Sequence, residues 1–338
     1  MNMTVYSEFQ PLETVVVGRL FPVDEYLQNL NLAEHWKNNF STILTKATEE
    51  LENLVEVLEN RNITVHRPTI YPMQATHGFY PAPLACRDWF LRYGDDCLVG
   101  NEAFERNLIR TTTTGHLYDR KHNIPTENIF SISSLDKFNC EDLVRAYFHT
   151  CNIVRLGKDL FVSGNYELTG NKLGMQYAVN WFKENFDVRI HVIENATDHL
   201  DSHIHIVKPG VMLSILTKDE LPDYFKNWTV IECNDFDKQQ AYGNTYAYKF
   251  KKLHPVIAKQ YASFMEANPE ETMFNINALS INENTILIPG FNAKIFDTLE
   301  EMGVECISVD FRAVSFFDCG VHCATNELDR IGPCEDYR

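Results

Sequence analysis

Short apolar runs, turn residues and amphipathic stretches recur along this chain in one order. Each copy of the pattern predicts two short strands joined by a turn, then a helix, then a third strand. Three copies are clear, over residues 151–193, 199–232 and 274–309. In the first copy the predicted strands are 151–155, 160–162 and 188–193, and the predicted helix is 173–186. A unit of this size cannot bury its own apolar face, so the copies must pack against one another.

Two further units are predicted nearer the start of the chain. Residues 87–99 form a predicted hairpin around a turn at Gly94. Residues 12–20 are predicted to be a buried strand, followed by an amphipathic helix over 40–60 and a strand over 63–65. We expect the first strand to pair with the C-terminal segment, which brings the number of units to five.

Five units in a closed ring give the predicted fold, an α/β protein forming a five-bladed pseudo-symmetric α/β propeller of repeated ββαβ units. We expect a single domain over residues 1–338, with any functional site on the pseudo-axis. Residues 234–271 break the rhythm with several tyrosines and a basic run, and we expect a lid or an insertion there. A surface loop with no role fits this segment equally well.

Composition narrows the classes of partner. The net charge of −17 argues against a nucleic-acid backbone and suits small cationic substrates. Nine scattered cysteines without a CxxC motif indicate a reducing compartment, and we expect a cytoplasmic protein. The printed sequence starts without a signal-like segment and holds no run of eighteen apolar residues, so we expect no membrane partner.

Residues 198–206 alternate polar and apolar positions, which predicts a strand whose polar face carries ionisable groups. Those groups are His199, Asp201, His203 and His205, all acceptable metal ligands. At roughly 3.3 Å per residue a strand spreads them over about 20 Å, so one ion could hold only adjacent members. Two other interpretations stay open, His199 as a general acid and base beside Asp201, and a solvent-facing polar edge.

If the units are copies, the starts of their first strands meet at the axis. Chemistry-bearing residues stand at these starts: Arg87-Asp88, His149 to Asn152, His199 to Asp201, and Cys319 to Cys323 at the closing end. A thiol, an imidazole and carboxylates from distant segments are what a cysteine-nucleophile site requires. Cys323 by itself is more often a small buried apolar residue than a nucleophile.

The motifs at these positions resemble those of a known family. Cys86-Arg87-Asp88-Trp89-Phe90-Leu91, His199-Leu200-Asp201 and Gly320-Val321-His322-Cys323 are similar to motifs of the arginine:glycine and inosamine-phosphate amidinotransferases, within the arginine deiminase superfamily. The resemblance runs from Leu12 to about Arg330. That family's fold is a five-bladed α/β propeller, in agreement with the repeats.

The resemblance implies an enzyme that moves the amidino group of arginine, or of a similar guanidine, to an amine through a covalent amidino-cysteine intermediate, releasing ornithine. Cys323 matches the nucleophile, and His199 matches the acid and base. Asp88 and Asp201 match the carboxylates that grip the guanidinium, where bidentate pairing fixes its orientation. We also assign Asn152, His149 and Arg312 to substrate binding.

The same resemblance implies no metal and no organic cofactor. The expected partners are an arginine-like donor and an amine acceptor, and we also consider a homodimer.

The sequence departs from the family pattern at two places that bear on catalysis and on the choice of acceptor. Where the family has two acids three residues apart, this chain has His149 and Asn152, which weakens support for an imidazolium and for a bound cation. Glu270 and Glu271 stand where the glycine-accepting family has small hydroxyl residues, which favours an acceptor other than glycine. Asn326 replaces a second family cysteine.

Three rival functions remain at this point. One is a guanidine hydrolase of the arginine deiminase type, and another is a catalytically impaired guanidine-binding homologue. The third is a metal-dependent hydrolase.

Overall fold

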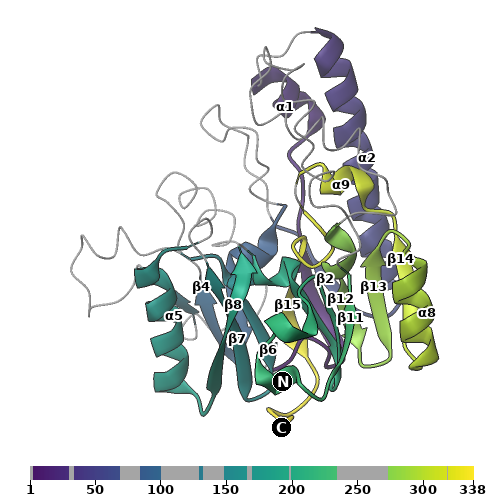
Figure 1. The fold of residues 1–338 in the computed structure, drawn as a ribbon. Coiled ribbons are helices and arrows are strands. Elements are labelled where there is room, and N and C mark those ends of the chain that lie inside the picture. Colours follow the sequence, from purple (N-terminus) through teal and green to yellow (C-terminus); the bar gives the residue numbers. More distant parts are fainter. Residues whose placement is uncertain are drawn as a thin grey trace.

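In the computed structural model, five three-stranded sheets of one plan form the described part of the chain (Figure 1). In each sheet the middle strand pairs antiparallel with one neighbour and parallel with the other. The structure describes residues 3–29, 34–68, 84–99, 129–131, 148–165, 170–197, 199–233, 273–317 and 319–338. The protein is therefore a mixed α/β protein, as the repeats predict.

The strands fall close to their predicted positions. Four sheets follow chain order: β3 (Phe90–Tyr93), β4 (Asp96–Val99) and β5 (Ile129–Ser131); β6 (Ile153–Leu156), β7 (Asp159–Asn165) and β8 (Arg189–Thr197); β9 (Ile204–Lys208), β10 (Val211–Ser214) and β11 (Thr229–Glu232); β12 (Leu279–Asn282), β13 (Thr285–Pro289) and β14 (Glu305–Val309). The fifth joins the two ends of the chain through β15 (Thr325–Arg330), β1 (Leu12–Val17) and β2 (Thr64–His66). The predicted pairing of the first strand with the C-terminal segment is confirmed, since Val17 lies opposite Thr325 in an antiparallel register.

Helices cover the sheets, and their ends follow local sequence. The helices are α1 (Val23–Asn29), α2 (Glu34–Glu59), α5 (Lys172–Asn185), α8 (Ala293–Glu301) and α9 (Arg312–Ser315). The side chain of Asn171 caps α5 by accepting from the Gly174 amide at 2.9 Å, and Asn292 caps α8 in the same way. The predicted helix over 40–60 is confirmed, although α2 begins earlier and is the long helix that rises above the sheets in Figure 1.

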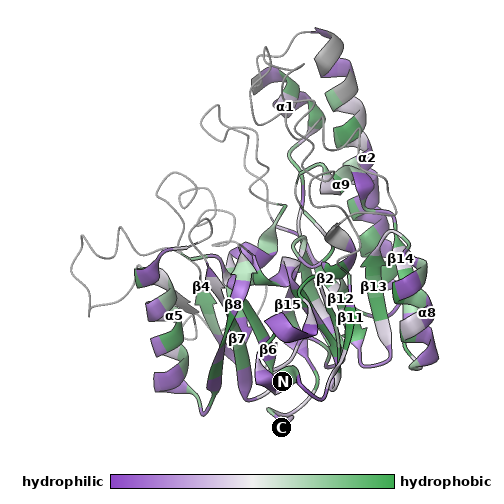
Figure 2. Cartoon of the chain, in the orientation of Figure 1, coloured by the Kyte–Doolittle hydropathy of each residue, from purple (hydrophilic) through white to green (hydrophobic). Residues whose placement is uncertain are grey.

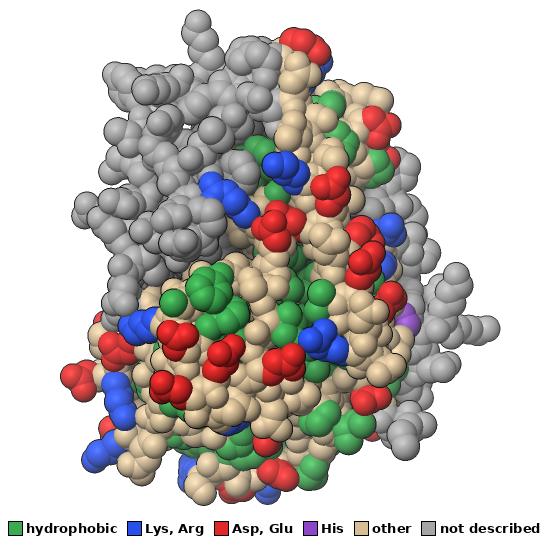
Figure 3. Space-filling model, turned by 90° about the vertical axis from the view of Figure 1, so that its right-hand side faces the viewer, with side chains coloured by type: hydrophobic (Ala, Val, Ile, Leu, Met, Phe, Trp, Pro, Cys, Tyr) green, Lys and Arg blue, Asp and Glu red, His purple; other side chains and the backbone are tan. Residues whose placement is uncertain are grey.

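Packing follows hydropathy. The sheet strands are mostly green in Figure 2, while α5 and α8 turn purple faces outward. The apolar stripe of α2 is buried against the sheet of β1 and against α9 through Leu44, Ala47, Leu51, Leu54 and Leu58. On the face shown in Figure 3, acidic side chains are scattered over the described surface, in keeping with the net charge of −17.

Three predicted elements are wrong in detail. The strand predicted over 198–206 is wrong for the described residues 199–203, because the amides of Ser202 and His203 bond back to the carbonyls of His199 and Leu200 in a 3-10 turn and β9 starts only at Ile204. The expected strand over 87–93 likewise begins with a 3-10 turn, Cys86–Asp88. The short helix expected over 220–226 is two 3-10 turns, Lys218–Glu220 and Asp223–Phe225, because Pro222 lies between them and has no amide hydrogen to continue a helix.

Neighbouring sheets contact one another in a fixed order. β15 lies against β3, the turn before β6 lies against β3, the turn before β9 lies against β6, and β12 lies against β9. The guanidinium of Arg330 on β15 donates to the carbonyl of Ser280 on β12 at 2.8 Å, which brings the last sheet back to the first.

A buried ion network ties the sheets together. Arg155 on β6 contacts Glu8 and Glu327, each at 2.8 Å, and Glu327 on β15 also contacts Arg87 at 2.5 Å and Arg330 at 3.2 Å. Burial alone would raise the pKa of Glu327, but the three arginines lower it well below its usual range. These five charged groups lie buried together, so removal of one partner would leave a buried charge uncompensated.

No helix in the part of the chain that the structure describes is long and apolar enough to cross a bilayer. The segment 234–271, expected to be a lid or an insertion, lies outside the described residues. The single domain over 1–338 and the cytoplasmic compartment stay predictions.

Candidate functional site

Each sheet's first strand is preceded by a tight turn, and the candidate residues lie on these turns. The turns are Cys86–Asp88 before β3, Thr150–Asn152 before β6, Leu200–Ser202 before β9, Met273–Ile276 before β12, and residues 321–324 before β15. The second turn contacts the first and the third, and the fourth contacts the third. The fifth turn joins them, because the Arg87 amide donates to the Cys323 carbonyl at 3.2 Å and the His322 amide donates to the Asn277 carbonyl at 3.1 Å. The expectation that the starts of the first strands meet is therefore confirmed.

Cys323 is held by Asn277, which follows the turn before β12. The amide of Cys323 donates to Oδ1 of Asn277 at 2.9 Å, and Nδ2 of Asn277 lies 3.1 Å from the Cys323 sulfur. Gly320 leaves the space for this clamp, because a Cβ there would lie 2.7 Å from Cγ of Asn277. The thiol is thus fixed in direction before any substrate binds.

Asp201 stands beside the thiol. Its Oδ2 lies 3.5 Å from the Cys323 sulfur and 2.8 Å from Nδ1 of His322. Burial acts to raise the pKa of Asp201, but the hydrogen bond from His322 and the nearby charges of His322 and His199 together lower it, so the group is a carboxylate at neutral pH. Its Oδ1 is buried and has no hydrogen-bond partner among the described residues, which leaves an anionic acceptor ready for a cation.

His199 completes this side of the site. One ring nitrogen of His199, an oxygen of Asp201 and the Cys323 sulfur all lie within 4.8 Å of one another. Burial acts to lower the pKa of His199, but the carboxylates of Asp88 and Asp201 and a hydrogen bond with Cys323 raise it to about 10. His199 is therefore an imidazolium at neutral pH and can supply a proton.

The thiol itself is protonated in the protein alone. A hydrogen bond with the Cys319 thiol and burial both raise the pKa of Cys323 well above its usual value, and Asp201 adds to the effect. A guanidinium cation held against the carboxylates would act in the opposite direction and favour the thiolate.

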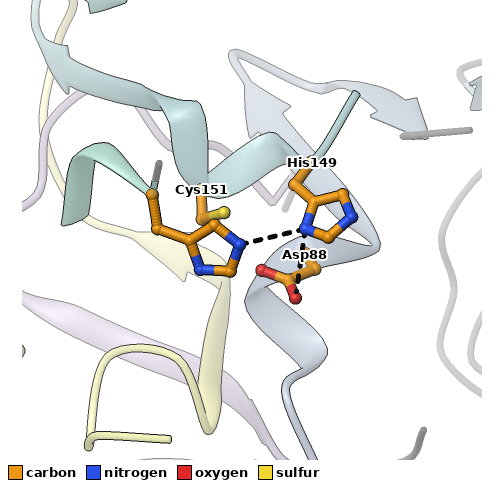
Figure 4. Close-up of side chains that lie close together, drawn as sticks. Asp88, His149 and Cys151 are labelled. Atoms are coloured by element: carbon orange, nitrogen blue, oxygen red, sulfur yellow. Dashed lines mark hydrogen bonds and ion pairs between the residues drawn. The ribbon is translucent and has the colours of Figure 1, made fainter. Parts of the chain in front are cut away.

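Asp88, His149 and Cys151 lie close together (Figure 4), each with a ligand atom within 4.8 Å of a ring nitrogen of His199. Nδ1 of His149 is 3.1 Å from Nε2 of His199 and 3.6 Å from Oδ2 of Asp88. Burial and the nearby Asp88 carboxylate, to which the thiol hydrogen-bonds, raise the pKa of Cys151 well above its usual value. The same nitrogen of His149 faces both groups, so it can accept a hydrogen bond from the His199 imidazolium or donate one to Asp88, according to its tautomer.

The other two residues predicted to bind substrate are Asn152 and Arg312. Asn152 is fully buried at the end of its turn. Arg312 opens α9, which packs against α2, and its role in substrate binding stays a prediction.

Two residues of the site were not singled out from the sequence. Asn277 stands between a turn and a first strand, the same position in its unit as the other candidates, and this equivalence is the signal that could have revealed it. His322 precedes Cys323 and bridges the site to the ion network, since its Nε2 lies 3.3 Å from Glu8.

The relatives found by comparing the sequence with known proteins include amidinotransferases. No protein-family model matches the chain. The chain is 23% identical over 386 residues to the mitochondrial glycine amidinotransferase of Xenopus tropicalis, covering 98% of this chain and 84% of that protein. It is 24% identical over 373 residues to a Streptomyces griseus protein named as an inosamine-phosphate amidinotransferase, covering 99% and 98% of the two chains.

Two solved structures share the fold. The inosamine-phosphate amidinotransferase of Streptomyces griseus matches with a TM-score of 0.71 at 18% identity over 99% of both chains. The dimethylarginine dimethylaminohydrolase of Pseudomonas aeruginosa matches with a TM-score of 0.62 at 11% identity, over 94% of this chain and 99% of that one.

Proposed function

This chain is a homologue of the glycine and inosamine-phosphate amidinotransferases, and from that relationship together with the meeting of the five turns we propose that it transfers amidino groups. The donor is arginine or a similar guanidine, the acceptor is an amine, and ornithine is the first product from arginine. The observation that carries the proposal is the closeness of the Cys323 thiol, the His199 imidazole and the Asp201 carboxylate, within 4.8 Å of one another.

In the first half of the proposed reaction, the guanidinium pairs with the carboxylates of Asp201 and Asp88, and the Cys323 thiol releases its proton to solvent as the cation binds. The resulting thiolate forms a bond to the central carbon of the guanidinium. The bond from that carbon to the ornithine nitrogen breaks. His199, charged at neutral pH, gives its proton to that leaving nitrogen. An amidino group then remains on Cys323.

In the second half, the acceptor amine loses a proton to His199 and attacks the amidino carbon. The carbon–sulfur bond breaks, and the new guanidine leaves. Because ornithine departs before the acceptor reacts, the kinetic expectation is a ping-pong pattern.

The shared plan of the five sheets supports a further part of the proposal. Their contacts run from β15 to β3, β6, β9 and β12 and back to β15 through Arg330. We infer that they are the blades of a five-bladed α/β propeller, with the turns gathered around its axis.

A test of the function uses arginine labelled in its amidino carbon. With an excess of candidate amines, the wild-type protein should release ornithine and move the label to an amine, and intact mass spectrometry of the quenched protein should show one added amidino group. Cys323→Ala should show neither product nor adduct. Cys97→Ala is the matched control, since Cys97 is an equally buried thiol on strand β4.

An adduct that persists in the Cys323→Ala protein would exclude the assigned nucleophile. The shared fold with a dimethylarginine hydrolase keeps one alternative in view, a guanidine hydrolase. Consumption of arginine to citrulline without any amine would favour that alternative. Binding of a guanidine without release of ornithine would instead indicate an impaired homologue.

A further inference from the structure

A mixed set of metal-binding side chains lies next to His199. One ligand atom each from Asp88, His149, Cys151 and His199 lie within 4.8 Å of one another. They come from the turns before β3, β6 and β9, three consecutive units of the fold. We propose that these four residues form a binding site for a divalent cation of the zinc class.

The distances suit a tetrahedral ion. Zinc bonds of about 2.0–2.3 Å place the ligand atoms of a tetrahedral site about 3.3–3.8 Å apart. Nδ1 of His149 lies 3.6 Å from Asp88, inside that range, and 3.1 Å from His199, slightly below it. The widest separation, up to 4.8 Å, has to close by about one ångström, which small rotations of these side chains supply.

The charges also match. On binding, the ion displaces one proton from the Cys151 thiol and one from the His199 imidazolium, and both protons leave to solvent. The resulting Cys151 thiolate and the carboxylate of Asp88 supply two negative charges, so the occupied site is neutral. That matters because Asp88, Cys151 and His149 are only 2%, 1% and 8% exposed, and an unbalanced charge there would be costly. Two imidazoles, one thiolate and one carboxylate are a ligand set that zinc accepts.

The other two clusters of such side chains in the described residues are less suited to a cation. Glu8, His322 and Glu327 face the guanidinium groups of Arg155 and Arg87, which would repel a metal ion. His199, Asp201 and Cys323 offer three ligands, and the amide of Asn277 already donates to the Cys323 sulfur.

Occupation of the site has a consequence for the protein. A metal bound to Nε2 of His199 and to Asp88 would keep both groups from acting in the proposed transfer, so occupation of the site should inhibit it. The inference itself does not depend on that function, because metal binding is measured without any substrate.

The test starts from protein freed of metal with a chelator and then titrated with Zn²⁺ or Co²⁺. One Zn²⁺ should bind per chain, and Co²⁺ should give the visible spectrum of a tetrahedral site together with a thiolate-to-cobalt charge-transfer band. Cys151→Ser should lose that band and bind Zn²⁺ at least about 100-fold more weakly. Cys323→Ser is the matched control and should keep the band.

His149→Asn provides an independent measurement, because it keeps both thiols. If Cys151→Ser does not fold, His149→Asn, verified as folded by circular dichroism, should still bind Zn²⁺ about 100-fold more weakly. Absence of stoichiometric binding to the wild type, or a cobalt band lost in Cys323→Ser but kept in Cys151→Ser, overturns the proposal.

Should the metal site fail in this way, the proposed transfer of amidino groups is untouched. Should labelled arginine give no product or adduct, the metal site can still be confirmed.

Discussion

Asn277 holds Cys323 at two points, accepting from its amide at 2.9 Å and placing Nδ2 3.1 Å from its sulfur. A hydrogen bond donated to sulfur favours the thiolate over the thiol. Asn277→Ala should therefore slow the covalent step, and we expect the rate of adduct formation to fall by about 10- to 100-fold. Alkylation of Cys323 by iodoacetamide as a function of pH should show a raised thiol pKa.

The control for this variant is Asn275→Ala. Asn275 is also buried, and its Nδ2 donates to the carbonyl of Pro289 rather than to the thiol. Both variants should lose some stability, but only Asn277→Ala should alter thiol reactivity. Equal alkylation profiles for the two would rule out the positioning role of Asn277.

The titration of His199 gives a second prediction. Burial lowers its pKa, but Asp88 leads the groups that raise it from 6.5 to about 10. The maximal rate of ornithine release should hold through neutral pH and fall as the pH rises through about 10, because His199 then loses the proton that it donates. Asp88→Asn should move this fall to lower pH, and the NMR titration of the His199 ring should move with it.

The raised pKa of His199 also makes the stability of the folded protein depend on pH. Because the folded-state pKa is raised, the stabilisation that His199 contributes is complete below about 6.5 and is lost as the pH rises through about 10. Asp95→Asn is the control for Asp88→Asn, since Asp95 lies on the exposed turn of the β3–β4 hairpin. An unchanged His199 titration in Asp88→Asn would show that another group sets the pKa.

A third prediction concerns the ion network beneath the turns. Glu327→Gln leaves Arg87, Arg155 and Arg330 buried without their shared carboxylate, and we expect the free energy of unfolding to fall by about 3–5 kcal/mol. Urea unfolding measures this. Glu305→Gln removes a carboxylate that is 60% exposed and lies 3.6 Å from Arg61, and it should cost less than about 1 kcal/mol.

Glu50 on α2 provides a fourth prediction. Its two oxygens accept from the backbone amides of Ala313 and Val314 in α9, each at 2.9 Å, while burial raises its pKa to about 7. The folded protein therefore binds the extra proton between about pH 4.5 and 7, so the contribution of Glu50 to stability should fall as the pH rises through that window.

The measurement is urea unfolding across that window for the wild type and for Glu50→Gln, which does not titrate. The difference between them should change by on the order of 1–3 kcal/mol. Glu56→Gln, on the same helix, should leave the wild-type pH profile in place. A wild-type profile parallel to that of Glu50→Gln would show that Glu50 does not titrate in this range.

Much of the fold follows from hydrophobic periodicity. The turns at Gly94 and Gly157, both with positive φ, and the apolar strands around them were predictable because glycine tolerates that conformation. Residues 199–203 were not, because alternating polar and apolar positions fit a 3-10 turn as well as a strand over so short a stretch. What decides between them is packing against the neighbouring turns.

The candidate site was predictable where a motif or a repeat position marked it, as for Asp88, His199 and Cys323. The contact of His149 with His199 depends on two turns fifty residues apart and has no local signal. Asn277 was hidden for a similar reason, because an asparagine next to a strand is usually a turn residue.

The sheet that carries the nucleophile is built from both extremities of the chain, where the Thr4 amide bonds to Asp329, 325 residues away in sequence. Such a pairing closes a very large loop, so during synthesis it can form only after the segment with Cys323 has emerged. A nascent chain could therefore form three or four of the sheets before the candidate site exists. The site would be completed in one late, cooperative step, when β15 pairs with β1.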